Sequence, residues 1–128
     1  MKNWLFILAG LAGLAVTLIR ALAGGAVDLE PILAALEGNS LRGVVIINWH
    51  AVTALLAILS IALLIASRLS QPSKVVIGVI GALSFGAVCV TFMYVTAIET
   101  GSPFTFPPFI PLGIASGLSA AAAWFSRT

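Results

Sequence analysis

Residues 74–98 read KVVIGVIGALSFGAVCVTFMYVTAI, and no charged side chain lies between Lys74 and Glu99. An α-helix rises about 1.5 Å per residue, so about 20 predominantly apolar residues are needed to cross the roughly 30 Å hydrocarbon core of a bilayer. This segment is long enough and apolar enough to do so. It therefore predicts a helix that spans a membrane.

Three further segments meet the same requirement: residues 4–22, 43–66 and 108–125. Residues that stop helices lie between the four segments, namely Gly24-Gly25, the Ser-Gln-Pro-Ser of 70–73 and the Thr-Gly-Ser-Pro of 100–103. Pro108 and Pro111 fall at the start of the last segment, where a first turn tolerates proline. The sequence predicts a single all-α domain over residues 1–128, an integral membrane four-helix bundle.

The composition also indicates a membrane protein. Of the 128 residues, 61% are hydrophobic and 8% are charged, whereas about 25% of the residues in a soluble domain are charged. The six basic residues are scattered and form no basic face, which argues against nucleic-acid binding. The single cysteine, Cys89, excludes an intramolecular disulfide and a cysteine-rich metal site. In the middle of a span, it is expected to be a small apolar filler.

The longest connection joins the first two segments and has a helical pattern of its own. Its apolar residues recur on one helix face, while Glu30 and Glu37 lie off that face: the stripe is Leu29, Ile32, Leu33 and Leu36. Asp28 is expected to cap this helix, with Pro31 in its first turn. We predict a short amphipathic helix over about residues 29–37, on the membrane surface or over the mouth of the bundle. A simple packed connector is the alternative.

The charges indicate an orientation. The side of the amino terminus carries four of the six basic residues: Lys2, Arg68, Lys74 and Arg127. The opposite side carries the other two and all four acids: Arg20, Arg42, Asp28, Glu30, Glu37 and Glu99. The positive-inside rule then predicts a protein integral to the cell (inner) membrane with cytoplasmic N and C termini. Lys2 and Ala21-Leu22-Ala23 also resemble a signal peptide, but Arg20 directly before the small residues disfavours cleavage.

Small residues recur at every fourth position in three of the segments. Gly13 lies between Ala9 and Thr17, and further examples are Gly78 and Gly86 around Ala82, and Gly113 and Gly117 before Ala121. In a bilayer this spacing lets helix backbones approach closely, because packing rather than the hydrophobic effect holds the helices together. We expect these five glycines to pack helices. Surplus small faces would suit a homo-oligomer or a larger membrane complex, and packing within the chain alone is the alternative.

Polar side chains at membrane depth are costly, so they are the best candidates for a functional site. On the second segment His50, Thr53, Ala57 and Ser60 form a stripe that is expected to face the bundle. A polar cluster is predicted in the outer leaflet, made of Arg20, Asn48, His50, Thr91, Tyr94 and Glu99. Arg20 and Glu99 are its most plausible ion pair. In the alternative, Arg20 reaches the head groups, Glu99 lies in water and His50 is a neutral, hydrogen-bonded histidine.

The same residues argue against catalysis. One histidine and no carboxylate in the middle of a span leave little for acid–base chemistry or for proton transport, so we expect no enzyme, no catalytic residues and no metal site. Bis-histidine haem ligation needs a second histidine. A haem or quinone near His50 is kept as a minor alternative, and so is an ion-conducting bundle. Against conduction, apolar residues line the inner halves of the second and third segments: Leu63, Leu64, Ile77 and Ile80.

Two resemblances bear on function. The stretch Gly43-Val44-Val45-Ile46-Ile47-Asn48 is similar to fluoride channels, but Ser84-Phe85-Gly86-Ala87 stands where that family has a broken Thr-Phe-Ser-Thr segment. Residues 23–26, His50-Ala51, Phe92 with Tyr94, and Pro111-Leu112-Gly113 resemble the small four-helix inner-membrane proteins that include bacterial YgdD. That resemblance implies the four-helix topology and no particular activity.

The function expected from the sequence is structural. We expect a small accessory subunit that packs against a larger membrane complex, with the bilayer, a membrane protein or another copy of the chain as partners and no nucleic acid. The first alternative is a homo-oligomeric bundle that binds a small ligand, an ion, a lipid or a quinone. The second is a redox subunit linked to haem or quinone.

Overall fold

The computed structural model describes residues 3–104 and 109–127, and this part of the chain is helical without strands. Its elements are α1 (Asn3–Ile19), the π-helix η1 (Arg20–Leu29), α2 (Glu30–Ala35), α3 (Asn39–Ala66), α4 (Gln71–Thr100) and α5 (Phe109–Ser126). Lys2, residues 105–107 and Pro108 lie outside the described residues. The predicted all-α class is confirmed.

Four helices are long and apolar enough to cross a membrane: Asn3–Ala35, Asn39–Ala66, Gln71–Thr100 and Phe109–Ser126. They contain the four predicted segments, apart from Pro108, and each extends beyond its segment by at least one residue. The predicted stop at residues 100–103 is in place, because the left-handed Gly101 (φ 76°) ends α4. The break between α3 and α4 lies at residues 67–70, so only Ser70 of the predicted stop 70–73 is in it, and Gln71-Pro72-Ser73 form the first turn of α4.

The predicted stop at Gly24-Gly25 is wrong. The chain stays helical there as η1, in which the backbone N–H of Glu30 donates to the carbonyl of Gly25, five residues back. The wider π turns keep the helix continuous through Gly24-Gly25 and into α2, where Pro31 lies in the first turn.

The expected amphipathic helix is correspondingly shorter and is not separate. Residues Glu30–Ala35 form α2, which continues η1 and ends at Leu36 in an extended conformation. Asp28 is not its cap, since the cap position is Leu29 and no side chain bonds there. Arg42 Nη1 donates to the carbonyl of Leu33 over 2.8 Å, so the start of α3 is tied to the end of α2.

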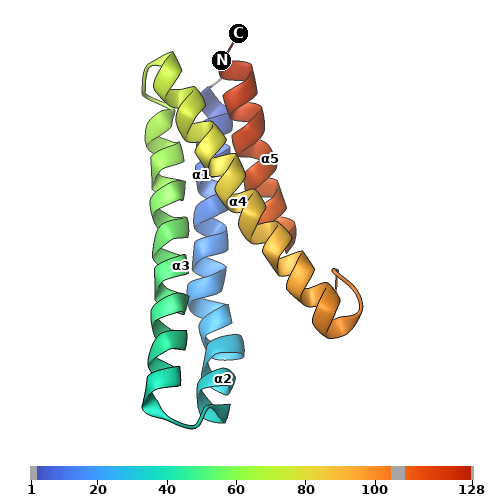
Figure 1. Ribbon diagram of the computed structural model, residues 1–128. Helices are drawn as coiled ribbons and strands as arrows, with labels where there is room; N and C mark the ends of the chain where they lie inside the picture. Colours follow the sequence, from blue (N-terminus) through green and yellow to red (C-terminus); the bar gives the residue numbers. More distant parts are fainter. Residues whose placement is uncertain (1–2, 105–108, 128) are drawn as a thin grey trace.

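The four long helices form two pairs (Figure 1). α1 packs along α3, and α4 packs along α5, while α1 also lies against α5. α4 crosses the others at an angle, so its carboxyl end leans away from α3 and η1 (Figure 1). Both ends of the described chain lie at the end of the bundle where the helix pairs are close together, which we name the closed end. We name the opposite end the open end.

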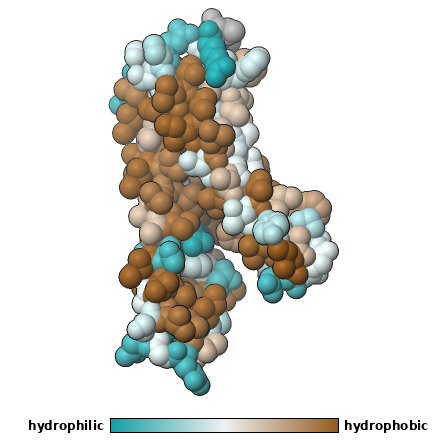
Figure 2. Space-filling model, in the orientation of Figure 1, coloured by the Kyte–Doolittle hydropathy of each residue, from teal (hydrophilic) through white to brown (hydrophobic). Residues whose placement is uncertain are grey.

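Polar contacts connect the helices at the closed end. Lys74 Nζ donates to Asn3 Oδ1 over 2.7 Å, which links α4 to α1. Gln71 Nε2 donates to the carbonyl of Ser126, which links the start of α4 to the end of α5. Hydrophilic residues gather at both ends of the long axis and in a patch in its lower half, and hydrophobic residues cover most of the remaining surface on this face (Figure 2). That is the distribution expected of a bundle that crosses a bilayer.

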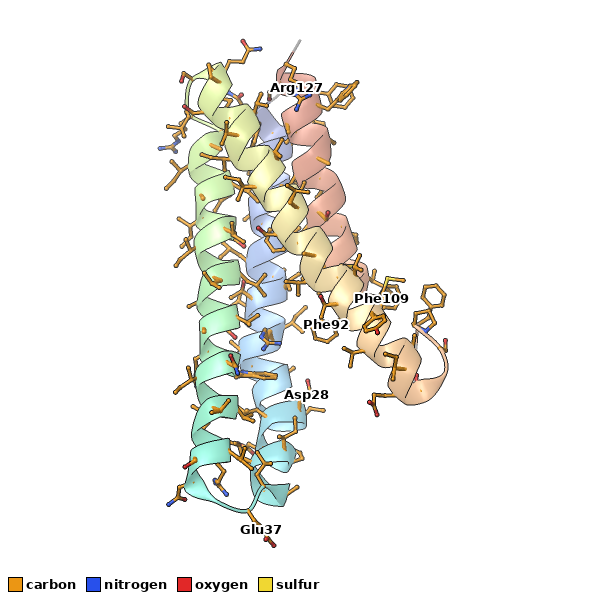
Figure 3. All side chains as sticks on the ribbon, in the orientation of Figure 1. Asp28, Glu37, Phe92, Phe109 and Arg127 are labelled. Atoms are coloured by element: carbon orange, nitrogen blue, oxygen red, sulfur yellow. The ribbon has the colours of Figure 1, made fainter. Side chains whose placement is uncertain are left out.

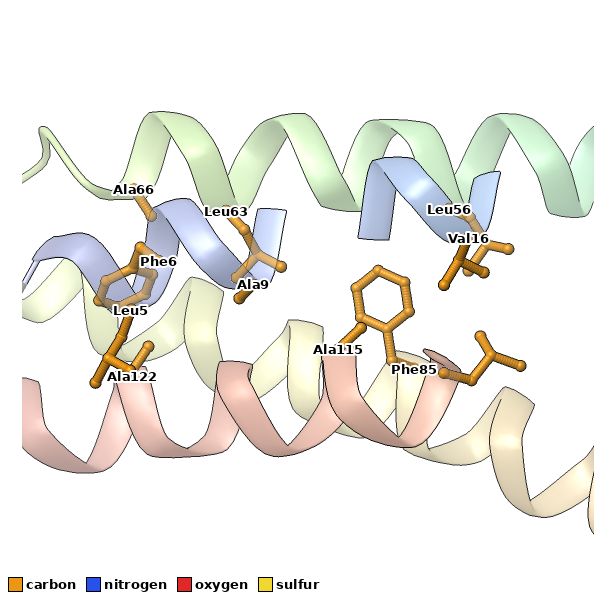
Figure 4. Packing of buried hydrophobic residues seen from close by; sticks show 11 residues of the cluster. Leu5, Phe6, Ala9, Val16, Leu56, Leu63, Ala66, Phe85, Ala115 and Ala122 are labelled. Carbon is orange, nitrogen blue, oxygen red and sulfur yellow. The ribbon is translucent and has the colours of Figure 1, made fainter. Parts of the chain in front are cut away.

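The core lies between the closed end and the middle of the bundle (Figure 4). Phe6, Leu63 and Phe85 are fully buried in it. The buried hydroxyls of Ser60 and Ser119 donate to the carbonyls four residues before them, so these polar groups cost little to bury.

Three of the five predicted packing glycines hold helices together. A Cβ on Gly13 would overlap Ser60 and Phe85, one on Gly78 would come within 2.9 Å of Ala123, and one on Gly86 within 3.1 Å of Ser116. The other two do not pack inside the chain. Gly113 has only Cys89 near its Cβ position, at 3.8 Å, and Gly117 has nothing within 4 Å. Both are exposed on α5.

Candidate functional site

The predicted polar cluster is not assembled. Thr91, Tyr94 and Glu99 are exposed on α4, with Tyr94 66% exposed, and the hydroxyl of Thr91 donates to the carbonyl of Ala87 in its own helix. Within the described residues Arg20 and Glu99 form no ion pair, because Arg20 contacts α3 instead. The tilt of α4 carries its last turns away from α1 and α3 (Figure 1).

The polar stripe on α3 is correct only in part. Ser60 is buried, and Thr53 and Ala57 are partly buried against the bundle. His50 is exposed, as is Asn48. The side chains of the two residues that were expected to carry the chemistry of this helix therefore lie outside the packed interior.

A crevice separates the two helix pairs in the open half of the molecule. It has a volume of about 470 Å³ and is bounded by α1 and η1, α3, α4 and α5. Its walls are mostly apolar and include Val16, Leu56, Val88, Phe92, Pro111 and Leu112. Figure 3 shows Phe92 from α4 and Asp28 from η1 extending into the space between the helix pairs.

The polar end of the crevice contains Arg20, the first residue of η1. Its Nε donates to Thr53 Oγ1 over 3.2 Å, and its guanidinium carbon lies 4.0 Å from the centre of the Trp49 ring. The Thr53 hydroxyl in turn donates to the carbonyl of Trp49 over 2.8 Å. The guanidinium is thus fixed by a hydrogen bond and by a cation–π contact.

Fixing the guanidinium in this way leaves most of its hydrogen-bonding capacity unused. Arginine has five N–H donors, and within the described residues Arg20 uses one of them. The side chain is only partly exposed and lines the crevice. The remaining donors are available to an acceptor that enters the crevice.

Gly24 shapes the same end of the crevice. A Cβ at this position would lie 3.1 Å from the Trp49 ring and 3.4 Å from Asp28 Oδ2. The missing side chain therefore lets the indole pack closely against η1. Asp28 is exposed, and its charge acts on Arg20.

The sequence predicts Arg20 as a site residue but not its partners Trp49 and Asp28, the second of which is expected from the sequence to be a helix cap. The signal for Asp28 is present in the sequence, because Arg20, Gly24 and Asp28 recur every fourth residue. The repeat brings the three residues onto one face only because the helix continues through Gly24-Gly25.

The remaining candidates do not form a site. Cys89 is partly buried, and its thiol lies 3.3 Å from the carbonyl of Phe109, so it links α4 to α5. Among the described residues, no group of three or more histidine, cysteine, aspartate and glutamate side chains could hold a metal ion.

Comparison with known proteins found no match to a family model, a curated protein or a solved structure.

Proposed function

We propose that this chain is an integral protein of the inner membrane, with both termini in the cytoplasm, and that it binds an amphiphilic molecule of the bilayer in the crevice. The observation that carries the proposal is an apolar space of about 470 Å³ with an oriented arginine at one end. The apolar walls would take the chain of the amphiphile, and Arg20 would take its polar end. The proposed role is binding, with no catalysis.

The size and position of the crevice support this role. Sites for small molecules and cofactors commonly have volumes of about 300–1,000 Å³, with apolar walls and a few oriented polar groups. The crevice lies between the helix pairs, and its apolar walls would face the lipid chains of a bilayer that these helices cross. A bilayer molecule could enter it sideways without leaving the hydrocarbon phase.

The binding experiment uses the full chain in mild detergent. Dioleoyl phospholipids are added, and the bound molecules are counted by native mass spectrometry. Val88→Trp places an indole in the crevice and is expected to remove most of the binding, while Val90→Trp, at a position 64% exposed on the same helix, should leave it unchanged. Equal binding by the two variants would exclude the crevice as the site.

The same preparation addresses the redox alternative. Organic extraction of the purified protein identifies any molecule that remains bound, and an absorption spectrum detects haem. A stoichiometric quinone would make the chain a redox subunit rather than a lipid-binding protein. His50 is exposed and does not line the crevice, so a haem on this residue would be a separate site.

A second candidate function is the accessory subunit expected from the sequence. The observation that favours it is the exposed pair Gly113 and Gly117 on α5: within the described residues nothing lies within 4 Å of a Cβ on Gly117, and only Cys89 approaches one on Gly113, at 3.8 Å. Small residues at this spacing let a partner helix approach closely. Gly117→Leu should then dissociate a partner or a second copy, as measured by cross-linking in native membranes. A monomer without partners in those membranes would contradict this candidate.

A further inference from the structure

The crevice carries two opposite charges at its polar end. Arg20 and Asp28 both line it, and Gly24 lies between them on the same face of η1. Trp49 lies against Gly24 and under the guanidinium, so all four residues meet at one place. A ligand that reaches Arg20 therefore also meets the carboxylate of Asp28.

The two charges do not neutralise each other by direct contact. Among the described residues, Arg20 and Asp28 share no side-chain hydrogen bond or ion pair, and the Asp28 carboxylate accepts no hydrogen bond. A charge of each sign is thus available to a ligand at the same end of the crevice. An anionic head group would be attracted by Arg20 and repelled by Asp28, whereas a head group with both charges could satisfy both residues.

The position along the helix fits the head-group region of a bilayer. Arg20 follows the 17 residues of α1, which correspond to about 26 Å at 1.5 Å per residue. The hydrocarbon core is about 30 Å thick. With the closed end of the bundle at one interface, Arg20 lies near the opposite one, and Asp28 lies further out.

On these grounds we infer that the crevice binds a zwitterionic phospholipid with a primary ammonium group, its phosphate at Arg20 and its ammonium at Asp28. The inference rests on the proposed function of the crevice. A primary ammonium donates charge-assisted hydrogen bonds to a carboxylate, which a trimethylammonium group cannot do. A trimethylammonium group is instead recognised by aromatic faces, and Arg20 already covers a face of Trp49.

The test is a competition among three phospholipids with the same dioleoyl chains: phosphatidylethanolamine, phosphatidylcholine and phosphatidylglycerol. Each is titrated onto the full chain in detergent, and apparent Kd values come from native mass spectrometry. We expect phosphatidylethanolamine to bind about tenfold more tightly than phosphatidylcholine, the ratio that corresponds to about 1.4 kcal/mol and one charge-assisted hydrogen bond.

Variants assign that preference to the two charges. Asp28→Asn should remove the preference for phosphatidylethanolamine over phosphatidylcholine and strengthen phosphatidylglycerol binding. Glu30→Gln, which removes an exposed carboxylate that does not line the crevice, is the matched control and should change neither. Arg20→Gln should weaken all three lipids, and Arg20→Lys, which keeps the charge, should recover part of the binding if the glutamine variant is poorly folded.

The outcomes separate the head-group inference from the proposed function. If Val88→Trp blocks binding but the three lipids bind equally well, the crevice binds lipid and the head-group inference is overturned. It is also overturned if Asp28→Asn keeps the wild-type preference or if phosphatidylglycerol binds best to the wild type. If no phospholipid binds and Val88→Trp has no effect, the proposed function fails together with the inference.

Discussion

The half of the bundle next to the closed end and the half next to the open end, named the closed half and the open half, are made of similar residues but pack differently. In the closed half, α4 presents Gly78, Gly81 and Gly86 to the other helices, and a Cβ on each would come within 3.3 Å of a neighbouring atom. In the open half, beyond Gly86, α4 has no glycine before Gly101 and carries Phe92 and Tyr94 instead. Gly78 and Gly86 pack α4 against α5 within their own pair, while Gly81 meets Leu63 of α3 and Gly13 of α1 meets Phe85 of α4, so the two pairs touch in the closed half and separate around the crevice.

Hydrophobicity alone does not decide where this bundle closes. Both halves are apolar, and inside a bilayer an apolar side chain gains little by leaving lipid for protein. Close backbone contact supplies the attraction instead, and it depends on side-chain size at the crossing. A large residue in the closed half should therefore disturb the fold, while a change in the open half should mainly affect ligand binding.

The largest effect is expected for Phe85→Ala in the closed half. Phe85 is fully buried at the centre of the core, between α1, α3 and α5 (Figure 4). Replacing a buried phenylalanine by alanine costs about 3–5 kcal/mol, because it removes packing contacts and leaves a cavity. Reversible unfolding in mixed detergent and SDS measures this loss. Leu83→Ala, at a position 68% exposed on the same helix, is the control and should cost much less.

The next largest effect is expected for Gly13→Leu. The added side chain would overlap Ser60 and Phe85, so α1 would have to move away from α3 and α4. Overpacking of a core costs about 1–3 kcal/mol. The matched control is Gly117→Leu, since nothing lies within 4 Å of that Cβ position. If both variants unfold at the same SDS fraction, close contact at Gly13 does not hold the closed half together.

The sequence allowed the four helices to be predicted, because the length of an apolar run does not depend on how it packs. It did not allow the continuity of the first helix to be predicted. Gly24 and Gly25 are a stop signal in water, where freed backbone groups bind solvent. Here the π turns of η1 keep those groups bonded within the helix, and Gly24 accommodates the ring of Trp49.

The candidate site was predictable only around Arg20. The predicted cluster assumed that residues at equal depth on different helices meet, which holds for parallel helices. The tilt of α4 separates Thr91, Tyr94 and Glu99 from Arg20, and no local pattern in the sequence encodes that tilt (Figure 1). The five glycines show the same limit. Their spacing predicts that they share a face of each helix, but it does not predict whether that face points into the bundle or away from it.

A smaller effect is expected for Arg20→Lys in the open half. Lysine keeps the charge and loses the planar guanidinium that both bonds to Thr53 and stacks on Trp49. We expect a loss of about 1–2 kcal/mol in stability, from one hydrogen bond and one cation–π contact. Unfolding in SDS measures the stability, and Trp49 fluorescence reports the stacking in a background where Trp4 and Trp124 are replaced by phenylalanine. Unchanged fluorescence would show that the stack does not form.

The smallest effect is expected for Thr53→Val, which has nearly the same shape and lacks the hydroxyl that accepts from Arg20. The loss should be about 0.5–1.5 kcal/mol, the net contribution of one hydrogen bond. Thr91→Val is the matched control, because that exposed hydroxyl bonds only to its own helix. Since Thr53→Val and Arg20→Lys both disturb the same bond, the double variant should lose less stability than the two single losses added together. Strict additivity would mean that Thr53 does not hold the guanidinium, and the orientation of Arg20 toward the crevice would then depend on Trp49 alone.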